Sequence, residues 1–117
     1  MTDRHSGLTP MTKIEVVIPG SHAHAVRDLI RTAGATGYTA VSGVSGFGHH
    51  GHHQGRLLFN DQAPLELLIT VAPPGTADTL ITALRRLLHT TAGVMFVTDT
   101  HVSRPDYFTN PDPTTSG

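Results

Sequence analysis

Apolar residues recur along the chain with two different periods, one typical of strands and one typical of helices. Residues from Lys13 to Ile18 alternate around β-branched side chains and stop at Pro19-Gly20, which predicts a strand. The segment that follows is predicted to be a helix, with Ser21 as its N-cap and Gly34 just past its end. Its apolar positions recur at helical spacing and comprise Ala23, Val26, Leu29, Ile30 and Ala33.

The middle of the chain predicts two further strands separated by a loop. Tyr38 to Val44 is rich in residues that favour strands, and Gly43 within it indicates a bulge or a close approach of the backbone. Leu65 to Val71 is nearly continuous in apolar residues and is broken by Pro73-Pro74-Gly75, which predicts another strand. Residues 45–60 between them form a loop that is rich in glycine and histidine.

The last third of the chain repeats a helix and a strand. Thr76 is the expected N-cap of a second amphipathic helix, whose apolar positions are Leu80, Ile81, Leu84, Leu87 and Leu88. Ala92-Gly93 turns the chain, and Val94 to Val102 predicts a fourth strand. The order βαββαβ predicts an α+β fold, the ferredoxin-like sandwich in which both helices cover one sheet face. The other face would expose apolar side chains unless another molecule covers it, which favours an oligomer.

Length, charge and composition narrow the class of protein. A chain of 117 residues predicts one domain at residues 13–108, with disordered tails at residues 1–12 and 109–117. The net charge of −1 argues against a nucleic-acid-binding protein, and the absence of Cys excludes disulfides, Cys-ligated metals and thiol catalysis. No apolar run approaches the ~20 residues of a membrane helix, and no signal peptide is visible. These features predict a cytoplasmic protein without membrane insertion.

The loop and the end of the last strand carry the candidate chemistry. The glycine-rich turn from Gly43 to Gly48 offers backbone N–H groups as an anion-binding nest, or else is only a flexible exit from the strand. Arg104 closes the last strand, where a guanidinium either binds a phosphate or carboxylate or stays solvated. No nucleophile-elbow pattern surrounds Ser45 or Ser103, so no enzyme activity is predicted. The loop also carries a run of four histidines, which are His49, His50, His52 and His53. Their imidazoles can chelate zinc, copper or nickel, although a solvated loop is the commoner outcome for such a run.

Four segments, in order along the chain, resemble the PII signal-transduction superfamily. They are Gly34-Ala-Thr-Gly-Tyr-Thr-Ala-Val41, Gly46-Phe47-Gly48, Leu65-Glu-Leu-Leu-Ile69 and Ala92-Gly-Val-Met-Phe-Val97. They are similar to the end of the first helix, the opening of the long T-loop, the third strand, and the B-loop with the fourth strand of that family. The resemblance covers about Lys13 to Arg104. It is closer to the PII-like branch tied to inorganic carbon, which includes carboxysome-associated and bicarbonate-transporter-associated proteins.

The resemblance implies a non-enzymatic homotrimer that binds ADP or AMP, and bicarbonate, in clefts between subunits without an obligatory metal. Arg104 would hold the phosphates, and Val17 and Leu68 would lie beneath the adenine. One wall of the cleft would consist of Thr36, Gly37, Gly46, Phe47, Gly48 and His49. The B-loop of the neighbouring subunit would contribute to the cleft or close it, through Thr91, Ala92, Gly93 and Val94. Bicarbonate would contact Gly46, Gly48 and Arg104.

Departures from the PII pattern favour inorganic-carbon signalling over nitrogen signalling. The loop lacks the Tyr that PII proteins modify, His49-His50 replaces the usual Arg-Gln, and Val94 replaces the usual Lys. The resemblance implies signalling through the T-loop to a bacterial protein partner, such as an inorganic-carbon transporter or a carboxysome component. Two alternatives use the same fold: a metal-responsive PII-like protein that uses the histidine-rich loop, and a trimer that only scaffolds a partner.

Overall fold

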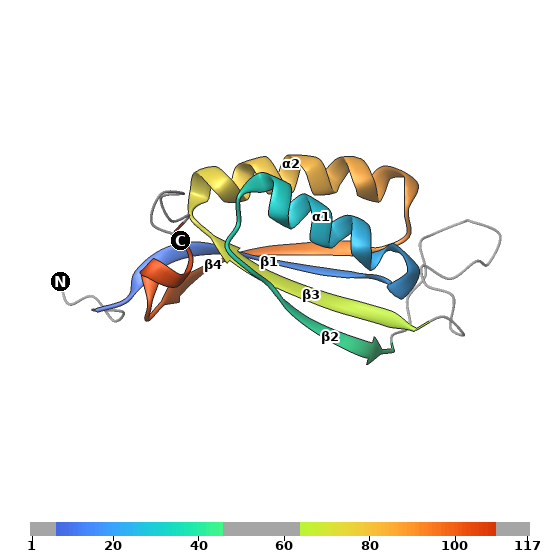
Figure 1. Ribbon diagram of the computed structural model, residues 1–117, viewed down its shortest axis with the longest axis horizontal. Helices are drawn as coiled ribbons and strands as arrows, with labels where there is room; N and C mark the ends of the chain where they lie inside the picture. Colours follow the sequence, from blue (N-terminus) through green and yellow to red (C-terminus); the bar gives the residue numbers. More distant parts are fainter. Residues whose placement is uncertain (1–6, 46–63, 110–117) are drawn as a thin grey trace, which may run out of the picture.

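The computed structural model describes residues 7–45 and 64–109, which form two layers (Figure 1). A four-stranded sheet forms one layer, and two helices lie side by side on one of its faces. The elements follow the order βαββαβ, so the predicted α+β ferredoxin-like sandwich is confirmed. They are β1 (Thr9–Pro19), α1 (Ala23–Ala33), β2 (Thr39–Val44), β3 (Leu65–Ala72), α2 (Pro74–Thr90) and β4 (Val94–Val102).

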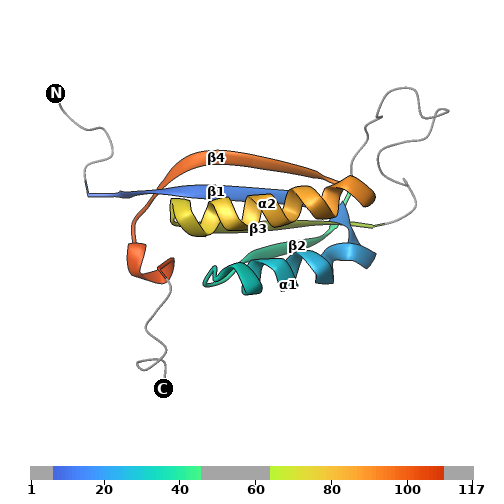
Figure 2. The same cartoon turned by 90° about the horizontal axis from the view of Figure 1, so that it is seen from above.

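The strands lie in the order β2-β3-β1-β4, and every neighbouring pair is antiparallel (Figure 2). Strands β2 and β4 are therefore the two edges of the sheet, and β1 and β3 are central. Across the sheet, Val94, Val17, Leu67 and Val41 lie at the same level. This register determines which predicted site residues can meet.

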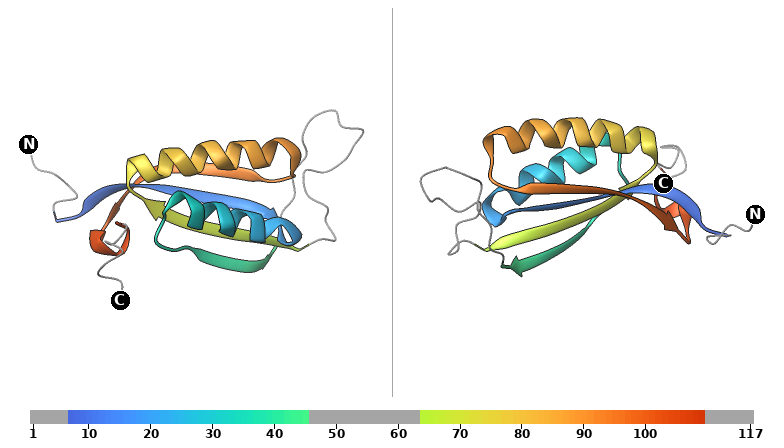
Figure 3. Two further views of the ribbon diagram at one scale, coloured as in Figure 1. Left: turned by 45° about the horizontal axis from the view of Figure 1, so that its top comes forward. Right: turned by 180° about the vertical axis from the view of Figure 1, so that it is seen from behind.

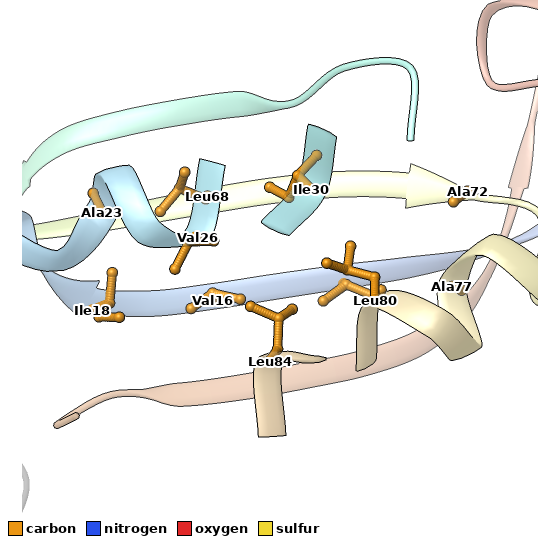
Figure 4. Close-up of a cluster of buried hydrophobic side chains, with 11 residues drawn as sticks. Val16, Ile18, Ala23, Val26, Ile30, Leu68, Ala72, Ala77, Leu80 and Leu84 are labelled. Atoms are coloured by element: carbon orange, nitrogen blue, oxygen red, sulfur yellow. The ribbon is translucent and has the colours of Figure 1, made fainter. Parts of the chain in front are cut away.

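The core lies between the sheet and the helices, and the central strands supply its floor (Figure 4). Alternate residues of β1 point toward the helices, because successive side chains of a strand face opposite sides. Ile14 and Ile18 are fully buried there, and Leu68 of β3 lies beside them. The helices contribute Val26, Ile30, Leu80 and Leu84.

Both helices begin differently from the prediction. Ser21 lies in a short 3₁₀ turn, Gly20–His22, and does not cap α1, whose N-cap is His22 without a side-chain hydrogen bond. Thr76 lies inside α2, which begins at Pro74. Proline suits the first helical position because its φ is already helical and its missing N–H would have no partner there. Among the described residues, no helix is long and apolar enough to span a membrane.

The ends of the strands carry one confirmed prediction and one correction. Gly43 has φ of 72°, and the pairing of β2 with β3 shifts register between Ser42 and Val44, which confirms the predicted bulge. Strand β1, however, begins at Thr9, four residues before Lys13. Residues 9–12, predicted to belong to a tail, pair with β4, and β1 and β4 run on together beyond the end of β3 (Figure 3). Local periodicity is weak there, and the pairing with β4 determines the strand.

Candidate functional site

The sheet face that the helices leave open carries a row of apolar side chains. Val17 belongs to this face, since Val16 and Ile18 on either side of it are buried beneath the helices. Leu67 lies opposite Val17 on β3. Leu68 is 1% exposed and lies in the core on the other face, so the prediction that Val17 and Leu68 lie together beneath an adenine is corrected. The prediction failed because the side-chain period of a strand is two, and a shift of one residue changes the face.

A tight turn between α2 and β4 packs directly against β1. Gly93 in this turn has φ of 147°, which favours glycine, and a Cβ there would lie 2.9 Å from the carbonyl oxygen of Val17. Val94 is paired with Val17 across the sheet. The structure thus brings Val17 together with Gly93 and Val94, and Thr91 and Ala92 directly precede them in the chain. We call this group the glycine-turn site: Val17, Thr91, Ala92, Gly93 and Val94.

A second group forms where α1 ends and the chain enters β2. The Thr70 hydroxyl, from the central strand β3, donates to the carbonyl oxygen of Gly37 at 2.7 Å. The Thr36 hydroxyl donates to the carbonyl oxygen of Tyr107 at 2.5 Å. This bond holds the segment after β4, which crosses beneath the end of the sheet to the α1 side (Figure 2). The Arg104 guanidinium carbon lies 5.6 Å from the centre of the Tyr107 ring, a cation–π distance.

We call this second group the helix-exit site; it comprises Thr36, Gly37, Arg104 and Tyr107. The sequence prediction did not assign Tyr107 to a site, nor Tyr38, which lines a cavity of about 150 Å³ together with Thr36, Gly37 and α1 residues. Both tyrosines are exposed, at 61% and 42%. The sequence signal that could have identified them is their position: Tyr38 directly follows Gly37, and Tyr107 lies three residues after Arg104, so each aromatic residue is close to a predicted contact and outside the core.

The cations near the helix-exit site differ in their partners. Arg27 is bound to Glu66 at 2.6 Å, and Arg31 to Asp28 at 3.2 Å. Among the described residues, Arg104 has no carboxylate within ion-pairing distance, and its guanidinium lies over the ring of Tyr107. Its guanidinium donors are therefore available to an anion, which is consistent with the chemistry expected at a phosphate or carboxylate contact.

The two sites lie on opposite edges of one sheet. The glycine-turn site adjoins β4, whereas the helix-exit site adjoins the start of β2, three strands away. With strands about 4.8 Å apart and about 3.3 Å per residue, Val94 and Thr39 are roughly 15 Å apart across the sheet. One copy of the chain therefore does not gather all the predicted residues around one small ligand.

The remaining predicted residues lie outside the described part of the chain. They are Gly46, Phe47, Gly48 and His49, together with the alternative metal ligands His49, His50, His52 and His53. Within residues 7–45 and 64–109, no group of three His, Asp or Glu residues is placed to hold a metal ion.

The fold and the divided site define a ferredoxin-like domain with candidate binding groups on two edges of its sheet. A family model described as "Nitrogen regulatory protein P-II" matches residues 11–107, so the chain belongs to the PII family, and its structural relatives place it in the PII-like branch. No curated protein sequence matches the chain.

Three solved structures illustrate these relationships. CPII, a PII-like protein from Thiomonas intermedia K12 bound to ADP, AMP and bicarbonate, is 36% identical with a TM-score of 0.74, over 88% of this chain and 97% of that one. CPII bound to ADP, AMP and acetate is 33% identical with a TM-score of 0.74, over 88% and 98% of the two chains. The GlnK–ATP complex of B. subtilis is 20% identical with a TM-score of 0.56, over 81% and 86%, and shows the shared fold alone.

Proposed function

We propose that this chain is a non-enzymatic regulatory protein that binds ADP or AMP, together with bicarbonate, between the subunits of a homotrimer. The observation that carries the proposal is the division of the site. Two groups of residues suited to one ligand lie on opposite edges of a single sheet, so a complete site requires the glycine-turn site of one copy and the helix-exit site of another. The related CPII, at 36% identity, was solved with ADP, AMP and bicarbonate.

The open face of the sheet supports assembly. Phe96 and Val41 are 53% and 44% exposed, and they share this face with Val17, Leu67 and Ile69. Apolar patches of this kind on a folded domain mark contact surfaces. Burial of apolar surface lowers the free energy by about 25 cal/mol for each Å² removed from water. Proteins of the PII family form homotrimers, and a trimer in which these faces meet would cover the patch.

The two sites offer complementary contacts for a nucleotide. The helix-exit site provides an exposed arginine for phosphate oxygens and the exposed ring of Tyr107, against which a flat base can pack; Tyr38 lies next to the site and is also exposed. The glycine-turn site provides the main-chain groups of a turn that lies tightly against β1, since Gly93 has no Cβ to collide with Val17. Val17 and Leu67 supply an apolar surface on the same face.

The remainder of the proposal concerns signalling. Bicarbonate is a small anion suited to backbone N–H groups of Gly46 and Gly48 and to Arg104. Ligand binding at the base of the T-loop would order residues 45–60 and so change affinity for a partner protein. A role in inorganic-carbon regulation, with a transporter or carboxysome component as the partner, agrees with the bicarbonate bound by CPII.

Calorimetry and mass measurement test the proposal together. Titration of the full chain with ADP and with AMP, in the presence and absence of bicarbonate, is expected to show binding, and light scattering to show a trimer of about 37 kDa from a 12.4 kDa chain. Arg104→Ala is expected to lower the affinity for ADP by about tenfold or more, because charge-assisted hydrogen bonds contribute ~1.5–3 kcal/mol. Arg86→Ala is the matched control, because Arg86 is an exposed arginine on α2 outside both sites. This variant should bind ADP as tightly as the parent chain does. A monomer, or no binding of either nucleotide, would refute the proposal.

A further inference from the structure

The open face of the sheet carries two charged side chains among its apolar ones. Lys13 and Glu15 lie two positions apart on β1, a central strand between β3 and β4 (Figure 2). They belong to the open face because Ile14, which lies between them in the chain, is fully buried beneath the helices. Every other residue that the described strands place on this face is uncharged. The two charges therefore lie in the middle of the surface by which copies of the chain are proposed to meet.

The same copy offers these two ions no further charged partner. Glu15 lies opposite Phe96 on β4 and opposite Ile69 on β3. Lys13 lies opposite Val71 on β3, and its neighbour on β4 is a threonine. Within residues 7–45 and 64–109, the contact between Lys13 and Glu15 is the only ion pair on the open face. Each ion thus depends on the other and on water.

Within one copy this ion pair is loose. Lys13 Nζ lies 4.0 Å from Glu15 Oε2, which is the limit of ion-pairing distance. A charge-assisted hydrogen bond between such groups is shorter, at about 2.7–2.9 Å. The two side chains are 37% and 29% exposed, so water reaches both ions in an isolated copy. Exposed pairs of this kind contribute little to the stability of a folded chain.

Contact between two open faces changes this balance. A covered face removes water from both ions, which is costly unless other groups bind them closely. A second copy supplies the missing groups, because its identical face carries one cation and one anion at the same place. In a cyclic assembly each copy contacts one neighbour with one part of its face and the other neighbour with another part. One cation and one anion in each copy then leave no charge unpaired.

We propose that Lys13 of each copy pairs with Glu15 of the next copy, so that the assembled chains hold a closed ring of alternating charges. This inference rests on the trimer of the proposed function and names the residues that align its subunits. The apolar side chains around the ring supply the attraction between the faces. The ring determines the register in which they meet, because misaligned faces would enclose unpaired ions or bring like charges together.

Zero-length cross-linking of the parent chain tests the pairing directly. Lys13 is the only lysine of the chain. A water-soluble carbodiimide joins a lysine amine to a carboxylate with loss of water, so an amide between Lys13 and Glu15 forms only where the two groups touch. Mass spectrometry of the digested product is expected to find two copies of the segment that contains both residues, joined at Lys13 and Glu15. Lys13→Arg is the matched control, since it keeps the charge and removes the amine; it should assemble as the parent does and give no such product.

Inversion of one charge tests whether the ring aligns the subunits. Glu15→Lys places two cations on each face and is expected to raise the concentration at which the trimer dissociates by at least about tenfold in light scattering. Lys13→Glu combined with Glu15→Lys exchanges the two charges and should restore assembly to within about threefold of the parent chain. Asp28→Lys is the control, because Asp28 pairs with Arg31 on the exposed side of α1 and should not affect assembly. Circular dichroism checks that each variant is folded.

The outcomes separate the ring from the proposed function. A parent trimer that gives Lys13–Glu15 cross-links only within single chains would overturn the ring and leave the proposed function standing. Equal assembly of Glu15→Lys and Asp28→Lys, or no recovery in the exchanged variant, would also overturn the ring alone. A parent chain that runs as a monomer would refute both. A trimer that forms the cross-link between copies but binds neither ADP nor AMP would support the ring and refute the nucleotide-binding part of the proposed function.

Discussion

Replacement of Gly93 by alanine tests how the α2–β4 turn is held against the sheet. A Cβ at this position would lie 2.9 Å from the Val17 carbonyl oxygen, 3.1 Å from Leu88 Cδ2 and 3.3 Å from Ile18 Cγ1. The first contact is with backbone of a central strand and cannot be relieved by a side-chain rotation. The second and third involve side chains packed at the end of the core, which have little room to move.

Two penalties add at this position. A residue other than glycine at positive φ costs about 1 kcal/mol or more, and overpacking a well-packed site costs about 1–3 kcal/mol. Gly93→Ala is therefore expected to lower the free energy of unfolding by about 3 kcal/mol. That is a large part of the ~5–15 kcal/mol that stabilises a domain of this kind. In a domain of this size such a loss lowers the melting temperature by roughly 10–20 °C.

Chemical denaturation followed by circular dichroism measures this loss, at one fixed protein concentration because assembly contributes to apparent stability. Gly75→Ala is the matched control, since Gly75 lies in the first turn of α2 and a Cβ there would meet no atom within 4 Å. That variant should be unchanged or more stable by up to about 1 kcal/mol. If Gly93→Ala unfolds at the same denaturant concentration as the parent chain, the close packing described for this turn is wrong.

Two further substitutions test the remaining features of the site. Thr70→Val should lower the free energy of unfolding by about 1–2 kcal/mol, because it removes the 2.7 Å hydrogen bond to Gly37 from a residue that is 3% exposed. Thr82→Val, on the exposed face of α2, is the control in the same denaturation assay. Phe96→Asp should dissociate the trimer in light scattering without unfolding the chain, since Phe96 is 53% exposed on the open face. A variant at Val97, 43% exposed at the same edge but on the opposite face, should leave the mass unchanged; equal dissociation by Val97→Asp would argue against the open face as the contact.

The elements could be predicted because their signals are local. The apolar periods of α1 and α2 identify their buried faces, and the left-handed Gly34, with φ of 95°, ends α1 as predicted. The glycine inside β2 predicts a bulge or a close approach of the backbone from the residue type alone, and the structure has the bulge. The N-capping residues were not predicted correctly. Ser21 lies in the 3₁₀ turn before α1, and α2 begins two residues before Thr76, at Pro74, because proline suits the first helical position.

The sequence by itself determined the order of the elements, the ferredoxin-like class, and the roles of Gly34 at a helix end and Gly43 at a bulge. Each of these depends on residues close together in the chain. Only the tertiary structure decided which residues meet. Leu67 rather than Leu68 lies beside Val17, Tyr107 returns to Thr36, and the two halves of the candidate site lie on opposite edges of the sheet. The physical reason is that strand register and the path of the chain after β4 depend on hydrogen bonds between residues far apart in the sequence, for which no local period is a guide.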